Sequence, residues 1–503
     1  MNAPLRRIGV IVMVMFGLLF ANLNWVQAYR ADEYRNSPHN AGRVQIAEYQ
    51  HERGPILVGR DGFPVAVSEE TDGRLRYRRA YEQPRRWAHV VGYKPVNLGA
   101  TGIESFENDF LAGTGDRFFV DRMRDLFTGN VTVGGSLQTT LSRGAQQTGY
   151  EQLRDNQVGT GRGAVVALDP RTGAVQAMVS YPSFDPNPLA SHDTEEAQAA
   201  YDELDADGDR PLVNRVTAER FEPGSVMKVI DSAAALQAGL EPDTTLEGGA
   251  QYTAPTAGAA IGNSPGVVCP NEITLEQALT VSCNTAFSRL MAEELGGDAL
   301  RETAAGFGFF DEELAVGRLT GGGIPVAPSV TGELKREDGQ DDPPTVALSA
   351  IGQANVQMTP MQGAMIAAAV ANGGVQMKPY LVAQLQDAQL RPVYEADPEE
   401  LRQPVSGEVA GALQQMMASV VTSGTGRNAQ ISGYVVGGKT GTAETGGGAE
   451  DHGWFIGFAI DGDGEPVSAV AVLLENAGSG GSAEAARIGG QVMRAVIDDQ
   501  GEG

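Results

Sequence analysis

The stretch Phe221-Glu-Pro-Gly-Ser-Val-Met-Lys228 is followed by a mostly apolar run that extends to Ala238. If a helix begins here, Ser225 and Lys228 share one helical face, about one turn apart. A serine hydroxyl becomes a nucleophile when a neighbouring base takes its proton, and a desolvated lysine amine can be that base. The N-terminus of a helix also favours developing negative charge. Alone, however, Ser-x-x-Lys also describes an ordinary surface serine and lysine.

Two further motifs follow in a fixed order, Ser282-Cys-Asn284 and Lys439-Thr-Gly441. Each is weak by itself, because short motifs of this kind occur by chance. Their order, with Ser225 opening a predicted helix and Lys439 on a predicted strand, makes chance a poor explanation. Acyl transfer needs a nucleophile, a proton shuttle, an oxyanion hole and an anchor for the substrate carboxylate. The three motifs together carry residue types suited to all four tasks.

The first set of roles concerns proton transfer. We assign Ser225 as the nucleophile and Lys228 as its general base. The positive charge of Lys439 disfavours a second ammonium nearby and so helps to keep Lys228 neutral. Ser282 is the candidate proton relay to the leaving amine, and Asn284 would hydrogen-bond either Lys228 or the substrate amide.

The second set of roles concerns substrate binding. Lys439, Thr440 and Thr442 would hold the substrate strand and its terminal carboxylate. Gly441 would let that strand approach without a side chain in the way. The backbone N–H groups of Ser225 and Thr442 would form the oxyanion hole, which contributes roughly 3–4 kcal/mol per donor.

With these motifs, the chain resembles the class B, monofunctional penicillin-binding proteins, and in particular the penicillin-binding protein A type of actinobacteria. The resemblance covers most of the sequence. Besides the three motifs, the matching stretches include Arg53-Gly-Pro-Ile56, Arg60-Asp-Gly62, Gly102-Ile-Glu104, Pro182-Ser-Phe-Asp-Pro-Asn187, Gly352-Gln353, Gly424-Thr-Gly426 and Gly453-Trp-Phe-Ile-Gly457. One departure from the related class A β-lactamases is Cys283, which stands where those enzymes carry Asp.

The resemblance implies a mixed α/β (α+β) fold of the serine β-lactamase and penicillin-binding transpeptidase type. In that fold an antiparallel five-stranded sheet is flanked by helices, and a smaller β-containing pedestal domain precedes it. The implied activity is a serine-type D,D-transpeptidase that cross-links peptidoglycan stem peptides ending in D-Ala-D-Ala and releases the terminal D-Ala. Penicillin and other β-lactams would acylate the same serine. A glycan polymerase of the SEDS type is the implied partner.

Several alternatives remain beside transpeptidation. A class A β-lactamase needs a deacylating carboxylate, usually in Glu-x-x-Leu-Asn, and no Leu-Asn occurs between residues 284 and 439. A β-lactam sensor would need a cytoplasmic signalling domain, for which the residues before Ile8 leave no room. A membrane-anchored D,D-carboxypeptidase uses the same chemistry with water as acceptor and stays open. A non-catalytic scaffold of the cell-wall synthesis complex also stays open, although the intact motifs disfavour it.

The N-terminus indicates the compartment. Arg6 and Arg7 precede Ile8 to Tyr29, a segment without charged residues, which suits a transmembrane helix with the arginines on the cytoplasmic side. The competing interpretation is a cleavable signal peptide, with Val26-Gln-Ala28 as the cleavage site. Both interpretations place the rest of the chain outside the cytoplasm. We favour a single-pass anchor in the cell membrane.

Four segments follow from this interpretation of the chain of 503 residues. They are a cytoplasmic tail at 1–7, the transmembrane anchor at 8–29, a non-catalytic pedestal or dimerisation domain at 30–133, and the transpeptidase domain at 134–503. Apolar runs predict a hairpin over 163–168 and 173–179 and strands over 435–443, 453–460 and 467–475. Helical patterns cover 134–153, 273–295 and 483–498. The Arg- and Tyr-rich segment 74–86 suggests a solvated strand face.

Charge and cysteine content set further bounds. The net charge of −27 argues against a nucleic-acid partner, since phosphate binding needs clustered Lys and Arg. Cys269 and Cys283 are too few for a disulfide scaffold, but an oxidising compartment would permit a single bridge that closes a loop of about 15 residues. The five histidines are scattered without a His-Glu-x-x-His pair, so no metal and no other cofactor is expected.

Overall fold

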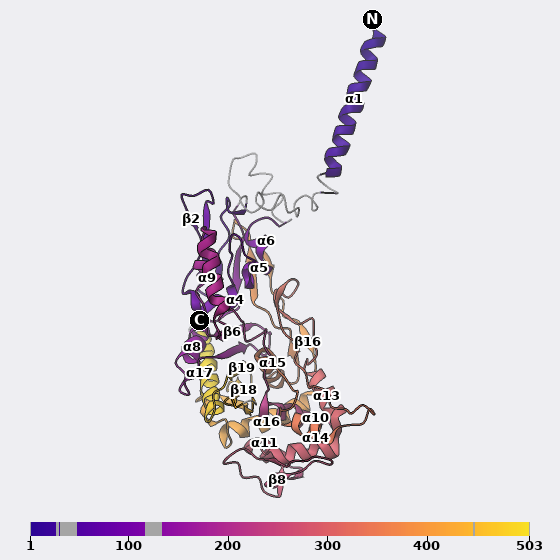
Figure 1. Ribbon diagram of the computed structural model, residues 1–503, viewed down its shortest axis with the longest axis vertical. Helices are drawn as coiled ribbons and strands as arrows, with labels where there is room; N and C mark the ends of the chain where they lie inside the picture. The colour runs from indigo at the N-terminus through magenta and orange to yellow at the C-terminus, as the bar shows by residue number, and fades with distance from the viewer. Residues whose placement is uncertain (1, 27–29, 31–47, 116–132, 446–447, 502–503) are drawn as a thin grey trace.

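The computed structural model describes residues 2–26, 30, 48–115, 133–445 and 448–501. Helix α1 (Asn2–Asn24) contains the apolar N-terminal segment, and its stretch from Arg6 to Asn24 is long and apolar enough to cross a membrane. None of that stretch is buried against the rest of the protein, and α1 projects away from it in Figure 1. Of the possible cleavage site only Val26 is described, and residues 31–47, at the start of the segment assigned to the pedestal, lie outside the described residues.

Five antiparallel strands form the sheet that the apolar runs predict. Their order is β17-β18-β19-β5-β6, so the three C-terminal strands extend a hairpin made much earlier in the chain. The expected hairpin and the expected C-terminal strands are thus confirmed, with every neighbouring pair antiparallel. The strands are β5 (Gly163–Leu168), β6 (Val175–Tyr181), β17 (Val435–Ala443), β18 (His452–Ile460) and β19 (Pro466–Leu474).

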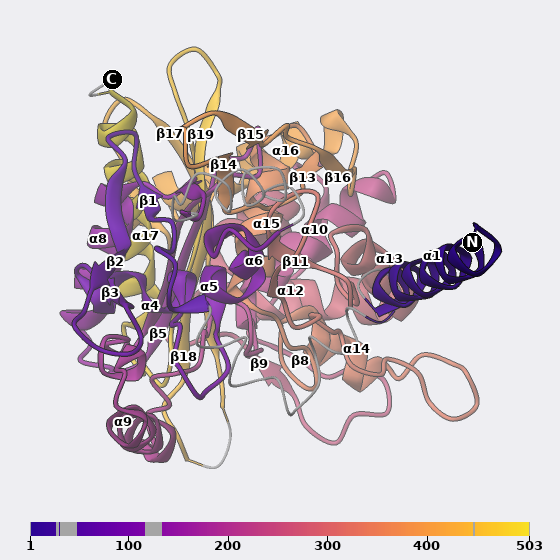
Figure 2. The ribbon, with the colours of Figure 1, turned by 90° about the horizontal axis from the view of Figure 1, so that it is seen from above.

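Both faces of this sheet are buried, which explains why its strands are continuous apolar runs. In β5, Ala164 and Val166 belong to one hydrophobic cluster, whereas Val165 and Ala167 belong to another, as the two-residue period of a strand requires. The two helix layers lie on opposite sides of the sheet (Figure 2). One layer holds α8 (Arg143–Arg154) and α17 (Gly481–Gly501), and the other holds α15 (Pro360–Ala371) and α16 (Gly407–Thr422).

A group of shorter helices extends beyond α15 and α16. The single helix expected over 273–295 is wrong, because the chain breaks at Ser282, which takes a left-handed φ of 63°. The break leaves α11 (Leu275–Val281) before it and α12 (Asn284–Arg289) after it. The other elements here are α10 (Lys228–Gln237), α13 (Gly296–Gly306), α14 (Pro343–Ala350), β7 (Thr245–Glu247), β8 (Gln251–Tyr252), β9 (Ile261–Gly262) and β10 (Glu272–Thr274). Helix α9 (Thr194–Ala206) lies apart from this group (Figure 1), and its Tyr201 and Leu204 pack with Ala88 and Tyr93. The chain also forms β11 (Ala315–Gly317) and β12 (Gly323–Pro325), which pair with each other.

A second sheet of six strands crosses the boundary that the sequence suggests at residues 133 and 134. Its order is β15-β14-β4-β1-β2-β3, so a strand that follows the boundary and two from much later in the chain join the N-terminal strands. The expected helix over 134–153 therefore begins as a strand, β4, and becomes helical only at α8. The strands are β1 (Ile56–Val58), β2 (Phe63–Glu70), β3 (Tyr77–Tyr81), β4 (Ser136–Thr139), β14 (Val382–Gln386) and β15 (Pro392–Glu395).

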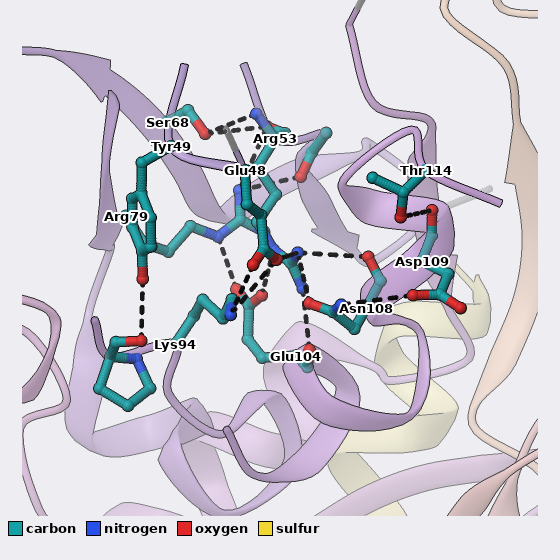
Figure 3. A network of polar contacts seen from close by, with 12 residues as sticks. Glu48, Tyr49, Arg53, Ser68, Arg79, Lys94, Glu104, Asn108, Asp109 and Thr114 are labelled. Atoms are coloured by element: carbon teal, nitrogen blue, oxygen red, sulfur yellow. Dashed lines mark hydrogen bonds and ion pairs between the residues drawn. The ribbon is translucent and has the colours of Figure 1, made fainter. Parts of the chain in front are cut away.

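A buried ion cluster lies between this sheet and the short helices α4 (Pro84–Val91), α5 (Gly102–Phe106) and α6 (Asn108–Leu111). Both carboxylate oxygens of Glu104 are taken, one by Arg53 Nε at 2.6 Å and the other by Arg79 Nε at 2.5 Å (Figure 3). Arg53 also donates to Asn108 Oδ1 at 2.9 Å. The interpretation of residues 74–86 as a solvated face is therefore wrong for Arg79, which is buried because Glu104 neutralises it.

The structure has a disulfide between Cys269 and Cys283, whose Cα atoms lie 5.7 Å apart. The bridge closes a loop of about 15 residues, which restricts the unfolded chain and stabilises the fold by about 3 kcal/mol. We expect the Cys269→Ala/Cys283→Ala variant to lose about that much free energy of unfolding in denaturant titrations. Reductant should destabilise the wild type by a similar amount and leave the variant unchanged. Equal stability of the reduced and oxidised wild type would contradict the prediction.

Candidate active site

Ser225 lies in a tight turn that precedes α10. Residues Gly224–Met227 form a single 3₁₀ turn, and the α-helix begins at Lys228. The turn starts at Gly224 with a left-handed φ of 53°, a conformation that favours glycine. The expected helix start at Ser225 is thus confirmed, with its first turn wound more tightly than an α-helix. Ser225 is 9% exposed, so its hydroxyl is close to the surface but shielded.

Lys228 connects the first two motifs. Its Nζ lies 3.0 Å from Ser225 Oγ and 3.1 Å from Ser282 Oγ. It also donates to Asn284 Oδ1 at 2.6 Å and to the Ser282 carbonyl oxygen at 2.9 Å. The side chain of Lys228 is fully buried. The break between α11 and α12 makes these contacts possible, because it directs Ser282 and Asn284 toward the same amine.

The third motif completes the group from strand β17. Lys439 Nζ donates to Ser282 Oγ at 2.9 Å and to the Thr440 carbonyl oxygen at 2.8 Å. Ser282 Oγ therefore lies between two lysine amines. Lys439 and Thr440 are buried, whereas Thr442 is exposed further along the same strand. The structure thus brings all three motifs together, from two helices and one strand that are far apart in sequence.

Burial sets the electrostatics of this group. The pKa of Lys228 lies well below its usual range, because burial disfavours the ammonium form and the charge of Lys439 adds to that effect. Burial also lowers the pKa of Lys439, to about 7. The carboxyl of Asp231 acts in the opposite direction on Lys228, but burial raises its own pKa well above the usual range. The lowered pKa therefore favours the neutral amine of Lys228, which can accept a proton.

Close backbone approaches fix the position of the nucleophile turn. A Cβ atom on Gly441 would lie 2.6 Å from the carbonyl oxygen of Pro223, so β17 passes directly over the turn. Gly224 N donates to the carbonyl oxygen of Gly352 at 3.0 Å. Since Cβ atoms do not approach other atoms so closely, Gly441 allows β17 to pack on the nucleophile turn. Its expected role in letting the strand approach the substrate stays a prediction.

We expect Gly224→Ala to disable the site. A Cβ there would lie 2.3 Å from the carbonyl oxygen of Thr442, so either the turn or β17 must move. Because a shift of about 1 Å can cost on the order of 100-fold in rate, acylation of Ser225 by a labelled penicillin should slow by at least that factor. Gly373→Ala is the matched control, because Gly373 has a similar φ of 62° in open space. If both variants acylate at the wild-type rate, the prediction fails.

Some positioning residues have no clear sign in the sequence. Trp454 is fully buried on β18, and its Nε1 donates to the carbonyl oxygen of Glu222 at 2.9 Å, just before the nucleophile turn. The Thr425 and Thr440 hydroxyls form a short hydrogen bond beside Lys439. Trp454 and Thr425 both lie in stretches that match the resembled family, and that match was the only signal available for them.

The three motifs converge here as they do in penicillin-binding proteins and serine β-lactamases, which defines the class of the protein. Residues 163–494 match the family described as "Penicillin binding protein transpeptidase domain". Residues 53–137 match "Penicillin binding protein A dimerisation domain". The chain belongs to the penicillin-binding protein family.

Individual relatives agree over almost the full length. The chain is 39% identical to "Peptidoglycan D,D-transpeptidase PbpA" of Mycolicibacterium smegmatis, covering 99% of this chain and 98% of that protein. It is 38% identical to the protein of the same name from Mycobacterium tuberculosis, covering 99% of each. Among solved structures, the penicillin G acyl-enzyme complex of penicillin-binding protein A from M. tuberculosis is 36% identical, with a TM-score of 0.80 over 90% of this chain and 99% of that one.

Proposed function

We propose that this protein is a peptidoglycan D,D-transpeptidase that works through an acyl-enzyme on Ser225. The observation that carries the proposal is the 3.0 Å contact between Ser225 Oγ and a buried Lys228 amine whose pKa is lowered. Support also comes from the relatives, two of which are named peptidoglycan D,D-transpeptidases. A related structure is a penicillin G acyl-enzyme complex, which supports acylation of this chain by β-lactams.

In the first half-reaction, neutral Lys228 takes the proton of Ser225 Oγ, which attacks the carbonyl carbon of the penultimate D-Ala. The oxyanion that forms would accept hydrogen bonds from the backbone N–H groups of Ser225 and Thr442. As the C–N bond breaks, the proton on Lys228 reaches the leaving D-Ala amine through Ser282 Oγ. The products are free D-Ala and an ester on Ser225, with Lys228 neutral again.

In the second half-reaction, the amine of another stem peptide attacks the Ser225 ester. Its proton passes through Ser282 and Lys228 back to Ser225 Oγ as the C–O bond breaks.

Lys439, Thr440 and Thr442 would hold the terminal carboxylate of the donor peptide. A charged Lys439 suits that carboxylate, and an anion bound beside it would favour its charged form. A β-lactam would follow the first half-reaction only, because its leaving nitrogen stays attached to the acyl group.

The location of the reaction follows from the N-terminus. Helix α1 would anchor the chain as a single pass, with Arg6 and Arg7 on the cytoplasmic side. The domains from residue 30 onward would then lie outside the cytoplasm, where the substrate is found. The disulfide between Cys269 and Cys283 supports that compartment. We assign residues 30–133 to the pedestal and 134–503 to the transpeptidase domain, with a SEDS-type glycan polymerase as partner.

The test is incubation with a stem peptide that ends in D-Ala-D-Ala together with an amine acceptor. Separation of hydrolysed from cross-linked product distinguishes a transpeptidase from a D,D-carboxypeptidase. We expect cross-linked product from the wild type and none from Ser225→Ala. A wild type that forms no covalent adduct with labelled penicillin would overturn the enzyme assignment and favour a scaffold.

A further inference from the structure

Asn263 contacts the second motif from outside. It follows β9 and lies in the segment that leads to the disulfide. Its Oδ1 accepts the backbone N–H of Asn284 at 2.8 Å and that of Thr285 at 3.3 Å. Its Nδ2 donates to the carbonyl oxygen of Gly249 at 2.9 Å. Both ends of the Asn263 amide are therefore used, and one end is bound to the first two residues of α12.

These bonds complete the cap of α12. The first N–H groups of a helix need acceptors outside the helix, usually a side-chain oxygen on the residue just before it. That residue is Cys283, whose sulfur is a weak acceptor and is engaged in the disulfide. It accepts the backbone N–H of Ala286, the third residue of the helix, at 3.4 Å. Asn263 supplies an oxygen acceptor for the N–H groups of the first two residues, from another part of the chain.

Gly262, which precedes Asn263, fixes the orientation of the Asn284 side-chain amide. Asn284 Nδ2 donates to the carbonyl oxygen of Gly262 at 3.0 Å, and its Oδ1 accepts from Lys228 Nζ at 2.6 Å. If the amide were reversed, its NH₂ group would face the lysine amine and its oxygen would face a carbonyl. The hairpin of β8 and β9 therefore determines which end of the Asn284 amide meets Lys228.

We propose that Asn263 is a positioning residue for acylation, acting through Asn284. By holding the first turn of α12, it keeps the side chain of Asn284 on Lys228. This inference rests on the proposed function, because the effect is read in the reaction of Ser225. The disulfide at Cys283 also holds this turn, but the acceptor of the Asn284 N–H is Asn263.

The experiment measures the rate of Ser225 acylation by a fluorescent penicillin in the full-length protein. We expect Asn263→Ala to slow acylation at least tenfold. Asn263→Asp keeps both acceptor contacts but sets an oxygen against the Gly249 carbonyl, so it should slow acylation less than Asn263→Ala. Asn271→Ala is the matched control, since Asn271 lies in the same connecting segment, is exposed and makes no side-chain hydrogen bond among the described residues. It should acylate at the wild-type rate.

A double-mutant cycle separates positioning from a merely structural role. In the Asn284→Ala background, Asn263→Ala should slow acylation less than twofold, because the residue through which it acts is gone. The same tenfold loss in both backgrounds would overturn the proposal, and so would a wild-type rate for Asn263→Ala. A wild type that is not acylated at all would instead overturn the proposed function. These outcomes are distinct.

Discussion

Lys228→Arg is expected to slow acylation of Ser225 about 10³-fold or more. Arginine does not give up its proton under these conditions, so it cannot accept the proton of the Ser225 hydroxyl. General-base catalysis contributes roughly 10²–10⁴-fold. The guanidinium would also add a permanent charge beside Lys439, in a position that is fully buried. The measurement is the rate of covalent labelling by a fluorescent penicillin, with thermal unfolding followed in parallel.

Two further variants keep this prediction decisive. Lys228→Met has a similar length without charge, so it removes the base without burying a guanidinium, and it should be equally inactive. Lys335→Arg is the control, because Lys335 makes an exposed pair with Asp298 at 2.8 Å and lies outside the active site. If Lys228→Met is folded and labels at the wild-type rate, the assignment of Lys228 as the base is wrong.

The same assignment sets the direction of the pH dependence. Burial and the charge of Lys439 lower the pKa of Lys228, and the amine must be neutral to act as a base. The rate of acylation should therefore fall as the pH falls through that lowered pKa, and a charged amine at low pH should leave Ser225 unreactive. A rate that rises toward acid would contradict the mechanism.

Much of the catalytic domain could be predicted because its strands and its motifs are each visible within a short stretch of sequence. The strands of the five-stranded sheet are buried on both faces, so runs such as 163–168 and 467–475 are apolar throughout and stand out between turns. The three motifs were recognisable because their side chains carry the chemistry themselves. Ser225, Lys228 and Lys439 have no ordinary structural reason to be buried together.

The features that the sequence did not predict depend on contacts between distant segments of the chain. The N-terminal sheet recruits β14 and β15 from far along the chain, and nothing in the sequence of 382–395 indicates that pairing. Ser282, which takes a left-handed backbone conformation, interrupts a pattern that is otherwise helical. The break directs Ser282 and Asn284 toward Lys228, and the helical pattern gives no sign of it. Asn263 acts on backbone N–H groups, so its role has no sequence signature beyond being an asparagine in a loop.

The sequence did not predict the burial of Arg79, because that burial also depends on a distant segment. Alternate residues of a strand face opposite sides, so β3 carries exposed Arg78 and buried Arg79 next to each other. Only the presence of Glu104, which comes from a different element, makes burial of an arginine tolerable. A charge pattern read along one strand cannot supply that partner.

Glu104→Gln is expected to destabilise the N-terminal part of the protein by about 3–5 kcal/mol. Removing one partner from a buried ion cluster leaves uncompensated charge, which costs far more than the cluster contributes by itself. Here Arg79 would lose its carboxylate and Arg53 would keep only Glu48, at 3.7 Å, and both arginines are nearly inaccessible to water. Hydrogen exchange of peptides that cover β1 to β3 measures the loss where it occurs. Glu69→Gln is the matched control, because Glu69 pairs with Arg78 at 2.9 Å on the exposed face of the same sheet, where such pairs contribute at most about 1 kcal/mol.

The pH dependence distinguishes a charge effect from a packing effect. Burial alone would raise the pKa of Glu104, but Arg79 and Arg53 outweigh it and lower the pKa below the ordinary value of 4.5. A carboxyl with a lowered pKa stabilises the fold above its unfolded pKa, and that contribution is lost as the pH falls through the folded value. The difference in stability between the wild type and Glu104→Gln should therefore be largest above about pH 4.5 and shrink in more acidic solution. A difference that stays constant with pH would mean that the cost arises from packing, since protonated Glu104 and glutamine are both uncharged.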